Sequence, residues 1–232
     1  NPYYGGGNEE YYMNLIADAM EPYLAASGIQ FTRNTPDMTA ASSIAASNAG
    51  NYDLHLALHS NAVGSGQQPT VRGIDAYYYP TSVSGKRFAD IAANNLQLIY
   101  PLPGMVKTVP TTRLGEVARV RAPGVLIELG YHDNPLDADW IRNNINNIAE
   151  NLVLSLTEYF GIPFNMPQPI QVGYVSTEGS NLNIRSRPDI GAPIIGKIPN
   201  GSEIVIYNRL PEWDLAGYGG VMGYVNSRYV AV

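Results

Sequence analysis

Hydrophobic residues recur with two different periods along the chain, and the change of period separates it into two parts. Up to residue 161, stripes of apolar residues at helical spacing alternate with short apolar runs that are typical of strands. This alternation predicts an α/β fold with a mainly parallel sheet and helices on both of its faces. The expected helices span residues 8–28, 37–50, 84–100 and 138–161, and the expected strands span residues 29–33, 53–59, 73–80 and 124–130. Pro22 lies inside the first stripe and is expected to kink or interrupt that helix.

The pattern changes after a proline-rich segment. Residues 161–171 hold three prolines and no helical period, which is typical of a linker. From residue 172 onward, apolar and polar residues alternate in short runs separated by Gly, Pro and Asn. This second pattern predicts a small all-β barrel of about 60 residues. We therefore expect one domain over residues 1–163, a linker over residues 164–171 and a second domain over residues 172–232.

Composition narrows the classes of function. A chain of 232 residues is longer than most single domains, which agrees with a division into two. The net charge of −6 disfavours a nucleic-acid partner, because phosphate binding needs a basic face. The chain has no cysteine, so any metal ion must be bound by His, Asp or Glu. It also has no run of about 18 apolar residues that would encode a membrane span.

Two of the three histidines, His55 and His59, lie four residues apart in the stretch DLHLALHSNA. On a helix this spacing would allow them to share a metal ion. The alternating leucines instead predict a strand, in which the two residues are about 13 Å apart and too distant for one zinc ion. His59 stands at the carboxyl end of that strand, where sites form in parallel sheets. We expect His55 to pack within the fold, whereas His59 alone fits a site or a structural role equally well, because one histidine does not make a site.

Two carboxylates add to the chemistry. Glu128 interrupts an apolar run at the end of a predicted central strand. Burial there would raise its pKa into the range of a general base, and the alternative is an ion pair with Arg119 or Arg121. Glu10 opens the first helix, where a carboxylate is also stabilised by the helix dipole alone, with Asn8 as the expected N-cap.

Three motifs in this order resemble the zinc-dependent N-acetylmuramoyl-L-alanine amidases of bacterial cell walls. The first motif is NEEYYMN, which opens the first predicted helix. The second is DLHLALHSNA, and the third is APGVLIELGYHDNP around the predicted central strand. The resemblance covers about residues 5–163. It implies an enzyme that hydrolyses the amide bond between N-acetylmuramic acid and L-alanine of peptidoglycan, with Zn²⁺ as cofactor.

The resemblance also implies roles for individual residues. In the first motif, Asn14 follows the family's glutamate by four residues, which selects Glu10 over Glu9 as a zinc ligand. His59 falls on the family's zinc-binding histidine and Glu128 on its catalytic glutamate. The implied mechanism is attack by a zinc-activated water whose proton passes to the glutamate.

The third zinc ligand is open. Catalytic zinc normally has three protein ligands, and the family's first ligand is a histidine in a loop that precedes the first helix. We expect that histidine either to lie upstream of this sequence or to be missing from this branch. His132, in the loop after the strand that carries Glu128, is a candidate third ligand. Asn61, directly beyond the strand of His59, is a candidate substrate-binding residue.

The second part resembles the bacterial SH3-like domains that accompany wall hydrolases. The stretches LNIRSRPDIGAPIIGKIPNGSEIVIYN and GYVNSRYV carry this likeness, which implies binding to the peptide parts of peptidoglycan and a location outside the cell, at the wall. Trp213 and Tyr224, together with Tyr174 and Tyr218, are candidates for a binding groove. The alternative is that these aromatic side chains fill the barrel.

Two other functions compete with the zinc amidase. One is a non-catalytic wall-binding protein that keeps a degenerate amidase fold and has lost its metal. The other, which sets the resemblance aside, is an unrelated α/β hydrolase with an added β-module. Zinc content separates the first alternative from the enzyme.

Overall fold

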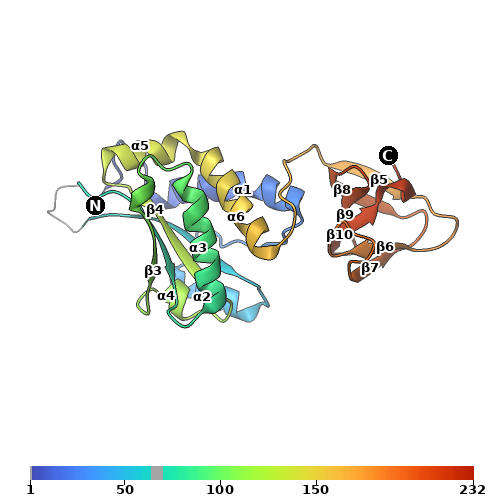
Figure 1. Ribbon diagram of the computed structural model, residues 1–232, viewed down its shortest axis with the longest axis horizontal. Coiled ribbons are helices and arrows are strands. Elements are labelled where there is room, and N and C mark those ends of the chain that lie inside the picture. Colours follow the sequence, from blue (N-terminus) through green and yellow to red (C-terminus); the bar gives the residue numbers. More distant parts are fainter. Residues whose placement is uncertain (1, 64–69) are drawn as a thin grey trace. The chain divides into compact units, whose positions relative to one another are not determined.

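A four-stranded sheet forms the centre of the larger of two structural units (Figure 1). The computed structural model describes residues 2–63 and 70–232. The larger unit comprises Asn1–Met20 and Thr32–Phe160, and the smaller unit comprises Glu21–Phe31 and Gly161–Val232. In the larger unit the strands are β1 (His55–Asn61), β2 (Ile74–Tyr78), β3 (Val106–Pro110) and β4 (Gly124–Tyr131).

The sheet is mixed, which corrects the expectation of a mainly parallel one. Its strand order is β1-β4-β2-β3. β1 runs parallel to β4 and β2 runs parallel to β3, but β2 and β4 are antiparallel. The physical reason lies in the connections. Parallel strands need a long crossover, which is usually a helix, whereas a connection without a helix can also join antiparallel strands. The sequence shows no helical period between β1 and β2, so it leaves their relative direction unspecified.

The helices follow the predicted bounds with a few differences. Residues 29–33 were expected to be a strand but form no ladder with any described strand. The predicted last helix is two helices. The first of them ends at Asn143, and the side chain of Asn144 donates to the carbonyl of Trp140 at this break. The chain remains helical through Pro22. The helices are α1 (Glu9–Ser27), α2 (Ala40–Ala49), α3 (Val83–Gln97), η1 (Pro103–Met105), α4 (Gly115–Ala118), α5 (Pro135–Asn143) and α6 (Ile145–Phe160).

The short helix α4 packs directly on the sheet. Val117 of α4 belongs to one buried cluster with Ala57 of β1 and Leu126 of β4. The backbone of α4 approaches Gly124 so closely that a Cβ there would lie 2.7 Å from the carbonyl oxygen of Glu116. Gly124 is therefore required for the position of α4. Among the other helices, α3 contacts β2, β3 and β4, and α6 packs against α3.

A buried carboxylate, Asp137 at the start of α5, ties together the loops beside the sheet. Asp137 is fully buried. It accepts hydrogen bonds from Arg72 Nε at 2.7 Å, Tyr100 Oη at 2.8 Å and the backbone N–H of Tyr131 at 3.0 Å. The loop that leaves β4 is thereby fixed to the segment that enters β2.

We expect Asp137→Ala to lower the free energy of unfolding by about 3–5 kcal/mol, because it leaves the Arg72 charge buried without its partner. Chemical denaturation followed by circular dichroism measures this loss. Asp139→Ala is the matched control on the same helix. Its side chain is 53% exposed and its ion pair with Arg142 lies at the surface, so we expect a loss below about 1 kcal/mol. Equal losses for the two variants would contradict the central role of Asp137.

The smaller unit is all-β apart from the end of α1 and one short 3₁₀ helix, η2 (Ser227–Tyr229). Its sheet has the order β11-β5-β8-β9-β10-β6-β7, and every described pairing in it is antiparallel. The core is formed by apolar residues that alternate along the strands, as predicted from the period of two. The strands are β5 (Gln171–Val175), β6 (Leu182–Arg185), β7 (Ile194–Ile198), β8 (Glu203–Arg209), β9 (Trp213–Tyr218), β10 (Val221–Asn226) and β11 (Val230–Ala231).

The end of α1 belongs to the smaller unit, whereas the sequence placed all of it in the first domain. Gly28 ends the helix with a positive φ of 77°. A Cβ at Gly28 would meet the Leu215 side chain at 3.1 Å. Asn208 donates to the carbonyls of Ala26 and Met166 at 3.4 and 2.9 Å. These contacts make the last turn of α1 part of the packing of the all-β unit.

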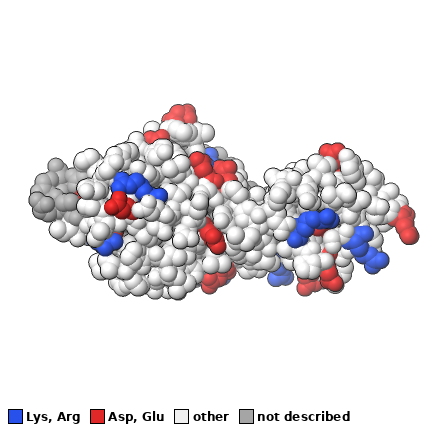
Figure 2. All heavy atoms as spheres, turned by 90° about the horizontal axis from the view of Figure 1, so that it is seen from above, with Lys and Arg blue, Asp and Glu red and all other residues white. Residues whose placement is uncertain are grey.

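On the face shown in Figure 2, Lys and Arg side chains are interspersed with Asp and Glu side chains and form no continuous basic surface among the described residues. Within the described ranges, no helix combines the length and the apolar character needed to cross a membrane.

Candidate active site

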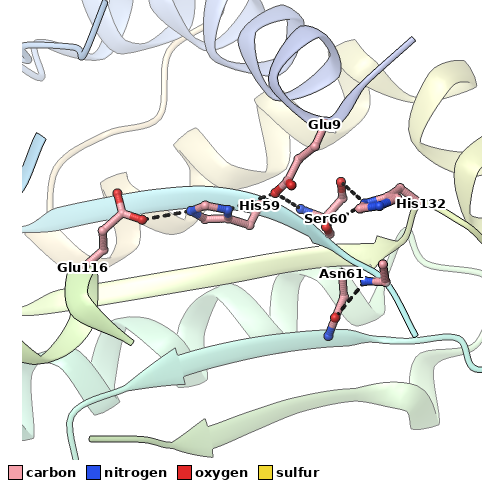
Figure 3. Close-up of polar contacts among 7 residues, drawn as sticks. Glu9, His59, Ser60, Asn61, Glu116 and His132 are labelled. Atoms are coloured by element: carbon pink, nitrogen blue, oxygen red, sulfur yellow. Dashed lines mark hydrogen bonds and ion pairs between the residues drawn. The ribbon is translucent and has the colours of Figure 1, made fainter. Parts of the chain in front are cut away.

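His59 lies between two carboxylates at the edge of the sheet (Figure 3). Its Nδ1 is 2.9 Å from Glu9 Oε1, and its Nε2 is 2.9 Å from Glu116 Oε2. Glu9 Oε1 also accepts the backbone N–H of Ser60 at 3.0 Å. The prediction that His55 and His59 lie on a strand is confirmed, because both belong to β1.

The charges of this group stabilise one another. Burial alone would lower the pKa of His59, but hydrogen bonds and the charges of Glu116 and Glu9 raise it to about 10. Burial would raise the pKa of Glu9, and its bonds to His59 and to the Ser60 amide outweigh this and lower it. Without a metal, His59 is therefore an imidazolium that donates from both ring nitrogens.

The structure brings Glu9, and not Glu10, to His59, whereas the sequence motif selects Glu10 as the metal ligand. α1 begins at Glu9, and neighbouring residues on a helix point about 100° apart. Glu9 is therefore half-buried against β1 while Glu10 is exposed. Asn14, which was used to set the register, instead accepts a hydrogen bond from Arg33. The predicted N-cap is confirmed, since Asn8 Oδ1 accepts the N–H of Tyr11 at 2.8 Å.

Glu128 lies beside His59 on the neighbouring strand. The two residues are register partners in the parallel pair β1–β4, and Asp75 of β2 is the partner of Glu128 on its other side. Register partners share one face of a sheet, so the three side chains point to the same side. Oε2 of Glu128 is buried and has no hydrogen-bond partner within the described residues. Among the described residues, Glu128 forms no ion pair with Arg119 or Arg121, and Arg121 donates to the carbonyl of Asn48 instead.

The environment of Glu128 gives its carboxyl the pKa of a general base. Burial raises the pKa of Glu128 to about 7, the Glu9 and Asp75 charges also raise it, and His59 opposes them. The pKa of Asp75 is itself raised, mainly by burial.

We expect the Glu128 carboxyl of the metal-free protein to titrate near pH 7, and Asp75→Asn to lower its midpoint, because that variant removes a neighbouring negative charge. Carbon-13 NMR of glutamate-labelled protein measures both midpoints. A Glu128 midpoint near 4.5 in the native protein would contradict the argument.

His132 lies apart from this group, so its role as a third ligand stays a prediction that this arrangement does not support. Its Nδ1 is 2.8 Å from the Ser60 carbonyl and 3.0 Å from Ser60 Oγ, and its ring stacks on Tyr3. Ser60 follows His59 directly, so its side chain points to the opposite face of β1. Figure 3 shows His132 turned toward Ser60 and away from the His59 ring. Asn61, the predicted substrate-binding residue, is half-buried and accepts the Ala62 N–H through Oδ1.

The donor set suits a divalent metal but is incomplete. A carboxylate oxygen and an imidazole nitrogen 2.9 Å apart, on Glu9 and His59, are ligand types that zinc prefers. Oε2 of Glu128, on the same face and without a partner among the described residues, fits a position for a reacting water. Across residues 2–63 and 70–232, however, no three His, Cys, Asp or Glu side chains are grouped to hold a metal. The Glu9–His59 pair therefore fits a metal with two of the usual three protein ligands.

Sequence reasoning set Glu9 aside in favour of Glu10, and it named neither Glu116 nor Asp75 as a candidate. Helix geometry would have identified Glu9 as the residue facing His59 only if the first residue of the helix had been known. Asp75 alternates with apolar residues in its strand, and a carboxylate in such a strand was a usable signal. Glu116 stands in a stretch for which the sequence predicted no element, so its position beside His59 came only from the fold.

The candidate groove residues of the smaller unit differ in exposure. Tyr224 is only 3% exposed and lies close to Gly28, so it fills the interior and the prediction of a groove role is wrong. Trp213 and Tyr218 are half-buried, and Tyr174 is 50% exposed on β5. Of the four aromatic residues, Trp213, Tyr218 and Tyr174 remain accessible to a ligand.

The chain is similar to amidases of known structure. An N-acetylmuramoyl-L-alanine amidase of Nostoc punctiforme shares 22% identity, covering 69% of this chain and 89% of that one, with a TM-score of 0.60. Amidases of the same name from Mycobacterium smegmatis and Clostridium difficile 630 share 17% and 18% identity, each with a TM-score of 0.60. They cover 69% and 68% of this chain and 81% and 86% of their own. No curated protein sequence matches the chain.

Family models divide the chain in two. The model of the N-acetylmuramoyl-L-alanine amidases matches residues 3–158, and that of the bacterial SH3 domain matches residues 180–231. The first match contains Glu9, His59, Glu116 and Glu128, and it overturns the alternative of an unrelated α/β hydrolase. The chain belongs to the N-acetylmuramoyl-L-alanine amidase family and carries a bacterial SH3 domain after its amidase part.

Proposed function

We propose that this protein hydrolyses the amide bond between N-acetylmuramic acid and L-alanine in bacterial peptidoglycan, with zinc as cofactor. The observation that carries the proposal is the carboxyl of Glu128. Its Oε2 is buried and has no hydrogen-bond partner in the part of the chain that the structure describes. The pKa of Glu128 is about 7, and the residue lies beside the Glu9–His59 pair on one face of the sheet. Membership of the amidase family supports the substrate.

Glu9 and His59 would hold the metal. When bound, zinc supplies a Lewis acid that polarises the amide carbonyl and lowers the pKa of water. Glu128 accepts the proton of the attacking water and then donates it to the departing amine of L-alanine. A pKa near the working pH suits both steps, because the group must first accept and then release the same proton.

The bacterial SH3 domain would hold the enzyme on its polymeric substrate. Trp213, Tyr218 and Tyr174 are its accessible aromatic candidates for contact with the peptide parts of peptidoglycan. Tethering raises the local concentration of the amidase part without any new contact at the reacting bond. We assign the amidase part to residues 1–163 and the wall-binding part to residues 172–232, and place the activity at the bacterial cell wall.

The test is an assay of purified peptidoglycan with metal-free and zinc-loaded protein. We expect the zinc-loaded protein to release new L-alanine amino termini and the metal-free protein to release none. Chelator followed by added zinc should remove and restore the activity. Wall binding without release, even with zinc present, would contradict the proposal and identify the protein as a non-catalytic wall binder.

A further inference from the structure

We propose that Glu116 is a positioning residue of the active site, which holds the His59 ring through Nε2 so that Nδ1 faces Glu9 and the metal. This inference rests on the proposed zinc amidase function. It adds a residue that neither the motifs nor the predicted elements pointed to.

The contact between Glu116 and His59 has the geometry of a charge-assisted hydrogen bond. Glu116 Oε2 lies 2.9 Å from His59 Nε2, and the Glu116 side chain is only 16% exposed. Figure 3 shows Glu9 and Glu116 approaching His59 from opposite sides of the ring. A carboxylate can only accept here, so Nε2 keeps its hydrogen.

The second oxygen of Glu116 faces the other histidine of β1. Glu116 Oε1 is 4.0 Å from His55 Nε2, and His55 Nδ1 is 3.0 Å from Ser47 Oγ of α2. The two histidines lie four residues apart on a strand and cannot share a metal, but both rings face the same carboxylate. Glu116 thus lies between them on the face of β1 that carries the site.

The fold holds Glu116 in place through its backbone. Its neighbour Val117 is buried against Ala57 and Leu126, and the Glu116 carbonyl lies against Gly124. Gly124 in turn is the register partner of His55. The carboxylate is therefore presented by a short helix packed on the same two strands that carry His59 and Glu128.

The consequence for the metal is a choice of ring nitrogen. An imidazole binds a metal through one nitrogen, and a carboxylate on the other N–H fixes the tautomer and the ring orientation. Because Glu116 occupies Nε2, only Nδ1 is left for the metal, and Nδ1 is the nitrogen beside Glu9. The described structure offers two protein ligands instead of the usual three. The affinity of this site for the metal therefore depends more strongly on the correct placement of each ligand.

The first test compares zinc affinity by chelator competition for the full chain and for Glu116→Ala, Glu116→Gln and Glu178→Gln. We expect Glu116→Ala to lower the affinity by about 10–100-fold. Glu116→Gln should lose less, because its amide oxygen still accepts from Nε2. Glu178→Gln removes the same charge from an exposed loop of the other unit and should bind as the unchanged protein does. Unchanged affinity in Glu116→Ala would overturn the proposal.

The second test identifies the metal-binding nitrogen by nitrogen-15 NMR of histidine-labelled protein. With zinc bound, we expect His59 to keep its proton on Nε2 and to carry the metal on Nδ1. Metal on Nε2 would overturn the proposal, because Nε2 would then have no hydrogen to donate to Glu116. If zinc binds and hydrolysis occurs but Glu116→Ala is unaffected, only this inference fails. If the unchanged protein neither binds zinc nor hydrolyses peptidoglycan, the proposed function fails with it.

A third variant moves Glu116 without replacing it. In Gly124→Ala, the new Cβ would lie 2.7 Å from the Glu116 carbonyl, so α4 must shift away from the sheet. We expect a loss of zinc affinity in the same direction as in Glu116→Ala. Folded Gly124→Ala protein with full zinc affinity would contradict a positioning role that depends on α4.

Discussion

Glu128→Gln is expected to lower the rate of amide hydrolysis by about 10²–10⁴-fold, because glutamine cannot accept the proton of the attacking water. The metal ligands in this proposal are Glu9 and His59, so zinc affinity should change far less than the rate. Release of L-alanine amino termini from purified peptidoglycan measures the rate, and chelator competition measures the affinity. Glu178→Gln is the control for the loss of one negative charge.

A stability measurement separates loss of chemistry from loss of fold. The folded-state pKa of Glu128 is raised from 4.5 to about 7, so its ionised form is less favourable in the folded state than in the unfolded state. Its contribution to stability therefore falls as the pH rises from about 4.5 to about 7. We expect metal-free Glu128→Gln to be more stable than the native chain at pH 8. A variant that is inactive because it is unfolded, or one that keeps full activity, would contradict the role of Glu128.

Glu9→Gln and Glu10→Gln form a matched pair of variants. They test whether Glu9, which the structure places at His59, or Glu10, which the sequence motif selects, binds the metal. We expect Glu9→Gln to lose zinc affinity and activity by about 100-fold or more, because it removes a carboxylate at His59 Nδ1. Glu10→Gln should remain within about twofold of the native chain, since the Glu10 side chain is exposed. The same zinc competition and wall assay measure both variants.

The two variants differ by one position on the same first turn of α1, so effects on helix start and helix dipole are similar. A loss in Glu10→Gln with native behaviour in Glu9→Gln would restore the register that the Asn14 spacing predicts. Equal losses in both would point to the dipole of the helix instead of ligation.

The sequence predicted those positions of the site that follow from the pattern of a single strand, namely His59 and Glu128. The alternating leucines around His59 place it at a strand end, and Glu128 stands out in an apolar run. The prediction for His59 rests on a period of two, and the prediction for Glu128 rests on a carboxylate within a continuous apolar run. Both tolerate errors of one or two residues in the strand ends. The all-β character of the second part was also predicted from a period of two.

Other features could not be predicted because they depend on tertiary contacts. The choice between Glu9 and Glu10 depends on a rotation of 100° about a helix whose start is uncertain by a residue. The place of His132 follows from its hydrogen bond to Ser60 across two strands. α4 is only four residues long, too short for a hydrophobic period, and Glu116 reaches the site through it.

The close approach at Gly124 has a consequence for the evolution of this fold. A larger side chain at position 124 would meet the backbone carbonyl of residue 116 and displace the short helix that presents the carboxylate there. Homologues should therefore vary the two positions together, and those with alanine or serine in place of Gly124 should have no acidic residue in place of Glu116. An alignment in which both occur freely in one sequence would show that the helix can bend to accommodate them.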